Sequence, residues 1–458
     1  MKILIVHNEY GKRSGEEAVV DKMAEIFAGL GLEVARLRRS TGEVRGTLAG
    51  KARAFVAGIY CPLGVRAMRR ALAEERPDLV NVHNLYPFIS PAALRECRRA
   101  GVPVVMTVHN FRLICPTGLF MRDGAPCELC LERGDEWGCV RHNCEHSRLK
   151  SLGYAARNAV ARLRQHYIDC VDVFACITEF QRRKLIEAGF PPERIVVIPN
   201  CAETGGQGRT GTQQPAPTPE AQAPGTQRPA AAHQGPTEGP TQQPAAAHQG
   251  PTQRPAAAEG VSSATGLCRG GYGQPAGGEA QTRGGYVGFC GRISREKGID
   301  LIAEAARRHP EIGFRLAGAV GDPELVADLP PNVELTGFLR GRDLEDFYEG
   351  ARFVVMASRC YEGFPMAILE AARHSRATVA PDHGGFTEIV SGAGVLFRSG
   401  DADSLAEAVS GLWHDPLRAS ALGRKAVERL RERYATPVVA RQWGEIVERL
   451  TGRKPSEG

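Results

Sequence analysis

Short apolar runs rich in Val and Ile alternate with longer amphipathic segments through two separate parts of this 458-residue chain. Expected strands and helices alternate along the chain, and such alternation is typical of parallel strands joined by helical crossovers. The alternation therefore predicts an α/β fold with two Rossmann-like parallel sheets, each covered by helices on both faces. The expected strands are 2–8, 33–39, 79–84, 102–110, 173–178 and 195–200 in the first part and 286–292, 314–319, 333–338, 351–358, 377–381 and 394–397 in the second.

A stretch of a different composition separates the two parts. Residues 203–283 consist largely of Pro, Ala, Gly, Gln and Thr and contain the imperfect repeat QRPAAAHQGPT, QQPAAAHQGPT, QRPAAAEG. So few apolar side chains cannot offset the entropy of ordering the chain, and we expect a long disordered linker. The predicted domains are then 1–202, with a Cys-rich insertion at about 115–146, and 284–430. The remaining residues, 431–458, are expected to form a C-terminal helix that packs back towards the first domain.

Composition excludes several classes of protein. No apolar run approaches the roughly 18 residues of a membrane-spanning helix, and the opening MKILIVHNEYGKRSGEE becomes polar too early for a signal peptide. We therefore expect a cytoplasmic protein whose 13 cysteines stay reduced. The net charge of +6 is too small for the dense basic surface of a nucleic-acid binder. Basic residues outnumber acidic ones in the first 200 residues, which leaves peripheral docking at the inner face of the membrane open.

The second part contains a candidate anion site. The segment CYEGFPMAILEAARHSRATVAPDHGGFTEIV follows the apolar run FVVMAS, and Pro365 suits the first turn of a helix. Backbone N–H groups around Gly363 and Phe364 would then be unpaired and, with the helix dipole, would attract an anion. Glu362 lies just before this helix and Glu370 lies within it. Carboxylates accept hydrogen bonds from paired hydroxyls, so one could hold a sugar and the other a ribose.

Two basic residues precede this segment. Arg292 and Lys297 fall in GRISREKGIDL, on a loop between an expected strand and an expected helix. Both side chains are cationic donors suited to a diphosphate, although basic loops are more often simply solvated. The pair Gly384 and Gly385, after a later strand, allows close approach of the backbone or makes a turn.

Taken together, the patterns G-R-x3-E-K-G, E-G-F-P-x4-E and G-G-x2-E resemble the donor domain of the retaining glycosyltransferases of family 4, which have the GT-B fold. The first part also resembles that family in Ser14-Gly15-Glu16-Glu17, in VNVHNLYPFISP and in TVHNFRLICPTGLFMRDGAPCELCL. The resemblance covers essentially the whole chain except the linker. It implies two Rossmann-like domains that face a cleft.

The resemblance also implies an activity. A nucleotide sugar would bind to the second domain, a glycan or lipid-linked acceptor to the first, and the sugar would be transferred in the cleft with retention of configuration. No metal or other cofactor would be required for catalysis, and cell-envelope or exopolysaccharide synthesis is the expected setting. The implied catalytic residues are Glu362 and His109. The implied donor contacts are Gly15, Arg292, Lys297, Gly363, Phe364, Pro365 and Glu370.

Three other functions are alternatives to glycosyl transfer. A sugar-nucleotide epimerase or hydrolase could use the same two-domain fold. A catalytically silent scaffold could recruit partners through the Pro-rich linker, although Glu362, Glu370, Arg292 and Lys297 are all in place. A dinucleotide dehydrogenase is disfavoured, because the first expected strand is not followed by G-x-G-x-x-G.

The Cys-rich insertion is a candidate structural metal site. Cys127-x2-Cys130-x8-Cys139-x4-Cys144 permits tetrahedral binding of zinc by thiolates. The second pair does not repeat the two-residue spacing of the first, so a loop of reduced thiols is the alternative. The other side chains that could serve as ligands are Cys115, His142 and His146.

Overall fold

The computed structural model describes residues 1–9, 15–41, 48–204 and 285–455, which belong to one compact unit of the chain. The stretch expected to be a disordered linker lies outside the described residues apart from its first two, and Ser14 lies outside them as well. Among the described residues, no helix is both long enough and apolar enough to cross a membrane.

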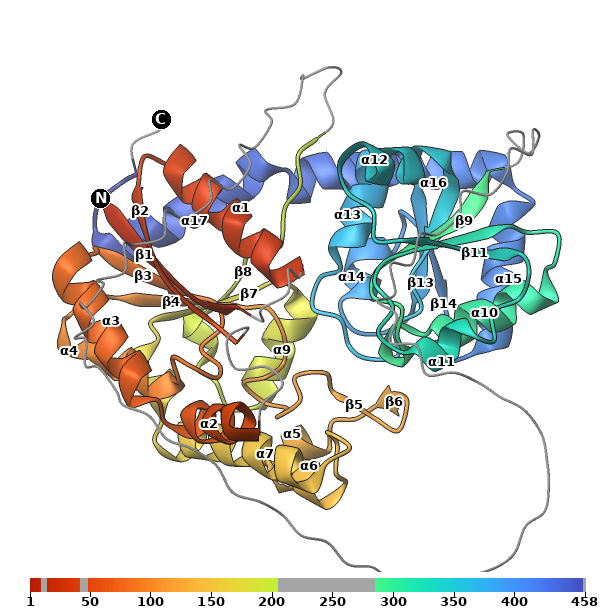
Figure 1. The fold of residues 1–458 in the computed structure, drawn as a ribbon. Helices are drawn as coiled ribbons and strands as arrows, with labels where there is room; N and C mark the ends of the chain where they lie inside the picture. The colour runs from red at the N-terminus through yellow and green to blue at the C-terminus, as the bar shows by residue number, and fades with distance from the viewer. Residues whose placement is uncertain (10–14, 42–47, 205–284, 456–458) are drawn as a thin grey trace, which may run out of the picture. The chain divides into compact units, whose positions relative to one another are not determined.

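The first part of the chain forms a six-stranded parallel sheet with the order β2-β1-β3-β4-β7-β8 (Figure 1). Alternate residues of β1 enter different cores: Leu4 and Val6 pack in one, Ile3 and Ile5 in the other. This alternation of side chains is what the period of two in a strand predicts, and it requires helices on both faces. The strands are β1(Lys2–Glu9), β2(Glu33–Ser40), β3(Leu79–Val82), β4(Val104–Val108), β7(Val173–Cys176) and β8(Ile195–Val197).

Helices cover both faces of this sheet. Met68 of α3 packs in the core with Leu4, and Phe27 of α1 packs in the core with Ile3. The helices are α1(Gly15–Gly29), α2(Leu48–Ile59), α3(Pro62–Glu75), α4(Leu94–Arg99), α7(Arg148–Leu163), α8(His166–Cys170) and α9(Glu179–Glu187). Between β4 and α7 the chain forms the Cys-rich insertion, with β5(Met121–Arg122), β6(Ala125–Pro126), α5(Leu129–Arg133) and α6(Trp137–Arg141).

The second part forms another six-stranded parallel sheet, with the order β11-β10-β9-β12-β13-β14 (Figure 1). The strands are β9(Tyr286–Cys290), β10(Phe314–Ala317), β11(Val333–Gly337), β12(Ala351–Val355), β13(Ala377–Pro381) and β14(Val395–Phe397). The chain adds strands outward from β9 in one direction and then from β12 in the other. Ligands of such sheets bind where the direction reverses, at the carboxyl ends of the two strands.

Seven helices accompany the second sheet, and the chain ends on a helix that packs elsewhere. The seven are α10(Ile299–Arg308), α11(Pro323–Val326), α12(Gly341–Gly350), α13(Met366–Arg373), α14(Phe386–Val390), α15(Ala402–Trp413) and α16(Pro416–Arg429). The last helix, α17(Thr436–Thr451), buries Trp443 against Phe27 of α1, with ring centroids 5.4 Å apart. The predicted fold class, two Rossmann-like parallel sheets, is confirmed.

Candidate functional site

The carboxyl ends of β9 and β12 carry the residues that the sequence singled out. After β9, a 3-10 turn over Arg295–Lys297 ends at Gly298, whose φ of 70° favours glycine. A Cβ on Gly298 would lie 2.0 Å from the carbonyl oxygen of Ala357. Glycine therefore lets the turn press against the end of β12, and this contact brings Lys297 beside the loop at 358–362.

A partly buried ion pair lies at this point. The Nζ of Lys297 donates to Oε1 of Glu362, and the Oγ of Ser358 donates to the same oxygen at 2.7 Å. Burial by itself would raise the pKa of Glu362, but Lys297 and Ser358 outweigh it, and the net shift is downward. Burial would lower the pKa of Lys297, and Glu362 reverses that shift as well. Both side chains are therefore charged at neutral pH, and they are only partly exposed to water, at 20% for Lys297 and 15% for Glu362.

The helix that follows adds positive potential to the same loop. Helix α13 begins after Pro365, and no side chain caps its first turn. Its leading N–H groups and its dipole therefore favour an anion. The Lys297 ammonium, the α13 N-terminus and the Glu362 carboxylate together suit a ligand with a diphosphate at one end and hydroxyls at the other.

Two glycines allow the Glu362 loop to lie against the ends of β4 and β7. A Cβ on Gly363 would fall 3.0 Å from the carbonyl oxygen of His109 and 2.8 Å from Cδ1 of Ile177. A Cβ on Gly385 would fall 2.5 Å from the carbonyl oxygen of Gly363. Gly385 of the G-G-x2-E pattern thus allows its own backbone to lie close to the backbone of Gly363.

The glutamate of that pattern makes a contact of its own. Glu388 accepts hydrogen bonds from the N–H groups of Glu179 and Phe180, at 2.8 and 3.3 Å. These two groups belong to the first turn of α9, where unpaired donors otherwise remain. The residue therefore ties the start of α9 to α14.

We expect Gly363→Ala to lower the free energy of unfolding by roughly 1–3 kcal/mol, since an added methyl group would displace Cδ1 of Ile177 and crowd the carbonyl oxygen of His109. Chemical denaturation measures this change. Gly411→Ala is the matched control, because that glycine is exposed on α15 and an added Cβ would meet no atom within 4 Å. The control should stabilise the protein by up to about 1 kcal/mol. Equal effects of the two substitutions would refute the close approach.

Three histidines gather at the carboxyl ends of β1, β3 and β4. Nδ1 of His83 lies 2.7 Å from Nε2 of His109, and the two rings stack with centroids 5.0 Å apart. His7 lies edge-on to His83 at 6.2 Å. Burial lowers the pKa of His109 to about 4 and that of His83 well below its usual value. Both rings are therefore neutral at pH 7, and one donates to the other.

Of the other predicted residues, Arg292 acts electrostatically on both members of the ion pair, whereas Gly15, Phe364 and Glu370 make their contacts elsewhere. Arg292 is 60% exposed and pairs with Glu296 at 2.8 Å. Oε2 of Glu370 forms an ion pair with Nε of Arg373, and the two atoms are 3.3 Å apart. Gly15 begins α1, and an added Cβ there would meet no described atom within 4 Å. Phe364 is buried among apolar residues that include Ile177 and Tyr434, so only its backbone is available to a ligand.

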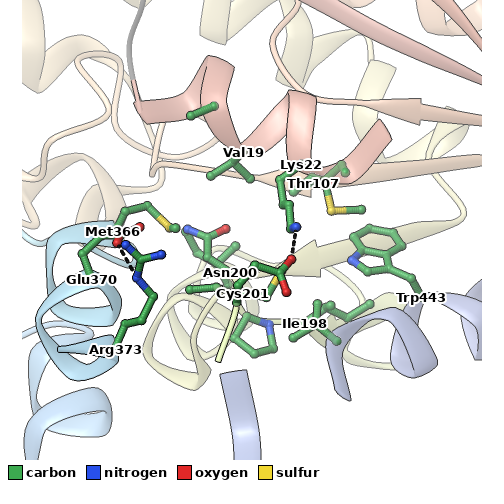
Figure 2. A pocket seen from close by; sticks show the side chains of 17 residues that line it. Val19, Lys22, Thr107, Ile198, Asn200, Cys201, Met366, Glu370, Arg373 and Trp443 are labelled. Atoms are coloured by element: carbon green, nitrogen blue, oxygen red, sulfur yellow. Dashed lines mark hydrogen bonds and ion pairs between the residues drawn. The ribbon is translucent and has the colours of Figure 1, made fainter. Parts of the chain in front are cut away.

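Glu370 lines a cavity of about 230 Å³. Figure 2 shows Glu370 paired with Arg373 at one end of this cavity and Trp443 at the other, with Lys22 and Asn200 between them. Among the predicted site residues that the structure describes, only Glu370 lines it. The cavity is therefore separate from the Lys297–Glu362 pair. The ammonium, the carboxylate and the α13 N-terminus lie at that pair and not in the cavity.

Sequence reasoning missed two residues of the site. Ser358 donates to Glu362 but belongs to no pattern, since a serine after a strand is common. His83 lies in the expected strand 79–84 and received no site role from the sequence, whereas the structure makes it the partner of His109. The repeated V-H-N after two neighbouring strands, at 82–84 and 108–110, is the signal that could have placed both histidines at one sheet edge.

Comparison with known proteins identifies relatives of both parts. Residues 14–201 match the family model described as "Glycosyl transferase 4-like domain", and residues 284–415 match "Glycosyl transferases group 1". The alpha-maltose-1-phosphate synthase of Mycolicibacterium smegmatis is 31% identical over 36% of this chain and 48% of its own length. The lipopolysaccharide core biosynthesis mannosyltransferase LpsB of Rhizobium meliloti is 26% identical over 36% of this chain and 52% of its own. The chain thus spans about half the length of these curated relatives.

Solved structures share the fold at low sequence identity. The Anabaena protein HepE, in complex with UDP and glucose, aligns with a TM-score of 0.59 at 15% identity, over 98% of this chain and all of its own. The sucrose-phosphate synthase of Thermosynechococcus elongatus aligns with a TM-score of 0.61 at 14% identity, over 98% and 99%. At this identity the likeness shows the two-domain fold alone.

Proposed function

Because the chain belongs to the glycosyl transferases of group 1, we propose that it transfers a sugar from a nucleotide-sugar donor to a glycan or lipid-linked acceptor, with retention of configuration. The observation that carries this proposal is the partly buried Lys297–Glu362 pair at the reversal point of the second sheet, beside the uncapped start of α13. Cation, helix N-terminus and carboxylate match the diphosphate and the hydroxyls of such a donor.

The proposed mechanism is electrostatic. As the bond between sugar and diphosphate breaks, positive charge develops on the sugar ring and negative charge on the leaving diphosphate. Lys297, the α13 N-terminus and Arg292 then stabilise the leaving group more strongly than the intact donor, which lowers the barrier. Glu362 holds the Lys297 ammonium in position before the donor arrives, so no reorganisation is needed during the reaction.

Neighbouring residues would orient the donor. In this proposal the backbone of Gly363, Phe364 and Pro365 faces the phosphate and sugar, and Glu370 accepts from the ribose hydroxyls. His109, kept neutral by burial, exchanges a hydrogen bond with a sugar hydroxyl while His83 fixes its ring. Gly15 allows the first domain to approach the donor. None of these steps requires a metal ion.

The proposed setting is synthesis of a cell-envelope polysaccharide or exopolysaccharide, at the inner face of the cytoplasmic membrane. The name of the Rhizobium relative, a lipopolysaccharide core mannosyltransferase, supports this setting. The excess of basic residues in the first 200 residues supports contact with anionic lipid.

A thermal-shift screen against UDP-, GDP- and ADP-sugars, without added metal, tests the donor site. We expect at least one nucleotide sugar to stabilise the protein by about 2.7 kcal/mol at a hundredfold excess over its dissociation constant. Lys297→Ala should lose most of this shift, whereas Lys425→Ala, an exposed lysine on α16, should keep it. A thermal shift that is unchanged in Lys297→Ala would show that the donor binds elsewhere than at this pair. The absence of a thermal shift with every nucleotide sugar would favour a scaffold.

A further inference from the structure

The cysteines of the insertion converge on one small space. Five thiols line a cavity of about 20 Å³, which is large enough for a single water molecule or ion. Cys139 and Cys144 share a hydrogen bond, and the thiols of Cys115, Cys127 and Cys144 act electrostatically on Cys130. The thiols are those of Cys115, Cys127, Cys130, Cys139 and Cys144, and we call them the thiol cluster.

The insertion has little apolar core of its own, since its buried Phe120 belongs to the core of the first sheet. Its helices α5 and α6 are five residues each, and α5 buries none of its side chains. Its backbone nevertheless makes tight turns through left-handed conformations at four non-glycine residues, Phe120, Asp123, Asn143 and His146. Such conformations persist only where surrounding contacts enforce them. A small subdomain without an apolar core is usually held by a disulfide or by a metal ion.

We propose that the thiol cluster is a structural zinc site, with Cys127 and Cys130 as two ligands and two more from Cys115, Cys139 and Cys144. The Cys-x2-Cys spacing of the first pair is that of a zinc knuckle. Four thiols release four protons as four S–Zn bonds form, and the product carries two negative charges. Arg122, which lines the same cavity, offsets part of that charge. With four protein ligands there is no open position for catalysis.

Zinc binding draws the sulfur atoms inward. A zinc ion with four sulfur ligands at about 2.3 Å holds them roughly 3.8 Å apart. Among the described residues, three metal-type ligand atoms within 4.8 Å of one another occur only at Glu345, Glu349 and His374. Those carboxylates are already engaged: Glu345 pairs with Arg373, and Glu349 with Arg342 at 3.5 Å. The thiols therefore stand further apart than in a filled site, and metal binding should tighten the insertion.

The insertion that holds the thiol cluster contacts the Glu362 loop at two points. Phe120 of the insertion packs on Tyr361, the residue before Glu362, with ring centroids 6.0 Å apart. The guanidinium of Arg359 donates to the carbonyl oxygen of Gly124 at 3.4 Å. Zinc that fixes the insertion would therefore also support the loop that carries Glu362.

The test is metal content. The full chain is equilibrated with zinc under reducing conditions, desalted, and analysed by plasma mass spectrometry. We expect one zinc per chain, and near zero in Cys127→Ser and in Cys130→Ser. Among the Ser variants of Cys115, Cys139 and Cys144, one should keep its zinc and so identify the spare thiol. Cys290→Ser, a thiol of similar burial outside the cluster, should keep the wild-type content.

A second measurement on wild-type protein covers the case in which the variants fail to fold. Cobalt should replace zinc and give thiolate-to-cobalt charge-transfer and tetrahedral d–d bands, and a mercurial should release the metal in proportion to the thiols it blocks. Three results would overturn the proposal: wild-type protein that retains neither metal, zinc that is kept in both Cys127→Ser and Cys130→Ser, or a Cys139–Cys144 disulfide found by mass spectrometry under reducing conditions.

Discussion

Replacing Glu362 by Gln should lower kcat by at least about a hundredfold, the effect of removing a preorganised electrostatic contact. The amide keeps the shape of the side chain but leaves the partly buried Lys297 ammonium without its counter-charge. The ammonium then loses the partner that holds it in position and that offsets the lowering of its pKa by burial. Lys297→Ala should lower kcat to a similar extent by removing the cation that offsets the diphosphate. Steady-state kinetics with a saturating donor measures both.

A matched pair of controls separates catalysis from stability. Glu407→Gln and Lys425→Ala change the same side chains on the exposed faces of α15 and α16, and kcat should stay within about twofold of wild type, as surface substitutions usually have small effects. The double variant Glu362→Gln/Lys297→Ala should be little worse than either single variant, since the two residues act as a unit. Wild-type rates in either single variant would remove the pair from the site.

Trp443→Ala should lower the free energy of unfolding by about 3–5 kcal/mol, the cost of removing a large aromatic side chain from a packed core. Trp443 is 1% exposed and packs edge-on against Phe27, with Ile3 and Val447 in the same cluster. The loss should also free α17 from the first sheet, so limited proteolysis should cut the C-terminal helix faster. Urea denaturation followed by circular dichroism measures the stability.

The control for this prediction is Trp137→Ala. That tryptophan lies on α6 and is 50% exposed, so its removal should change the free energy of unfolding by no more than about 0.5 kcal/mol. If Trp443→Ala were as mild as Trp137→Ala, α17 would not be anchored by its tryptophan.

The sequence predicted the sheets well because each strand is a short apolar run between polar turns. All twelve expected strands occur, and β13 has the predicted bounds, Ala377–Pro381. Several others end a few residues earlier than expected. The last residues of these expected strands lie in the loops after the strands and contribute to the site: His83 and Asn84 follow β3, and Ser358 lies beyond β12. Strand order could not be read from the sequence, since it depends on long-range pairing.

The candidate site was predictable in part. The E-G-F-P-x4-E and E-K-G patterns named Glu362 and Lys297, but nothing in their spacing shows that the two side chains pair, since 65 residues separate them. The contact between His83 and His109 was equally hidden, because it joins residues at the ends of two neighbouring strands. The role of Gly298 was also hidden, since only the structure shows which backbone it approaches.

The most direct test of the central claim is release of nucleoside diphosphate from nucleotide sugars by the purified chain, with acceptor candidates from envelope polysaccharide extracts. We expect acceptor-dependent release from one class of nucleotide sugar, with the sugar recovered on the acceptor and the rate in Glu362→Gln lower by at least about a hundredfold. Release that proceeds equally in wild type and Glu362→Gln would contradict transfer at the Lys297–Glu362 pair, and acceptor-independent conversion of the donor would contradict a transferase.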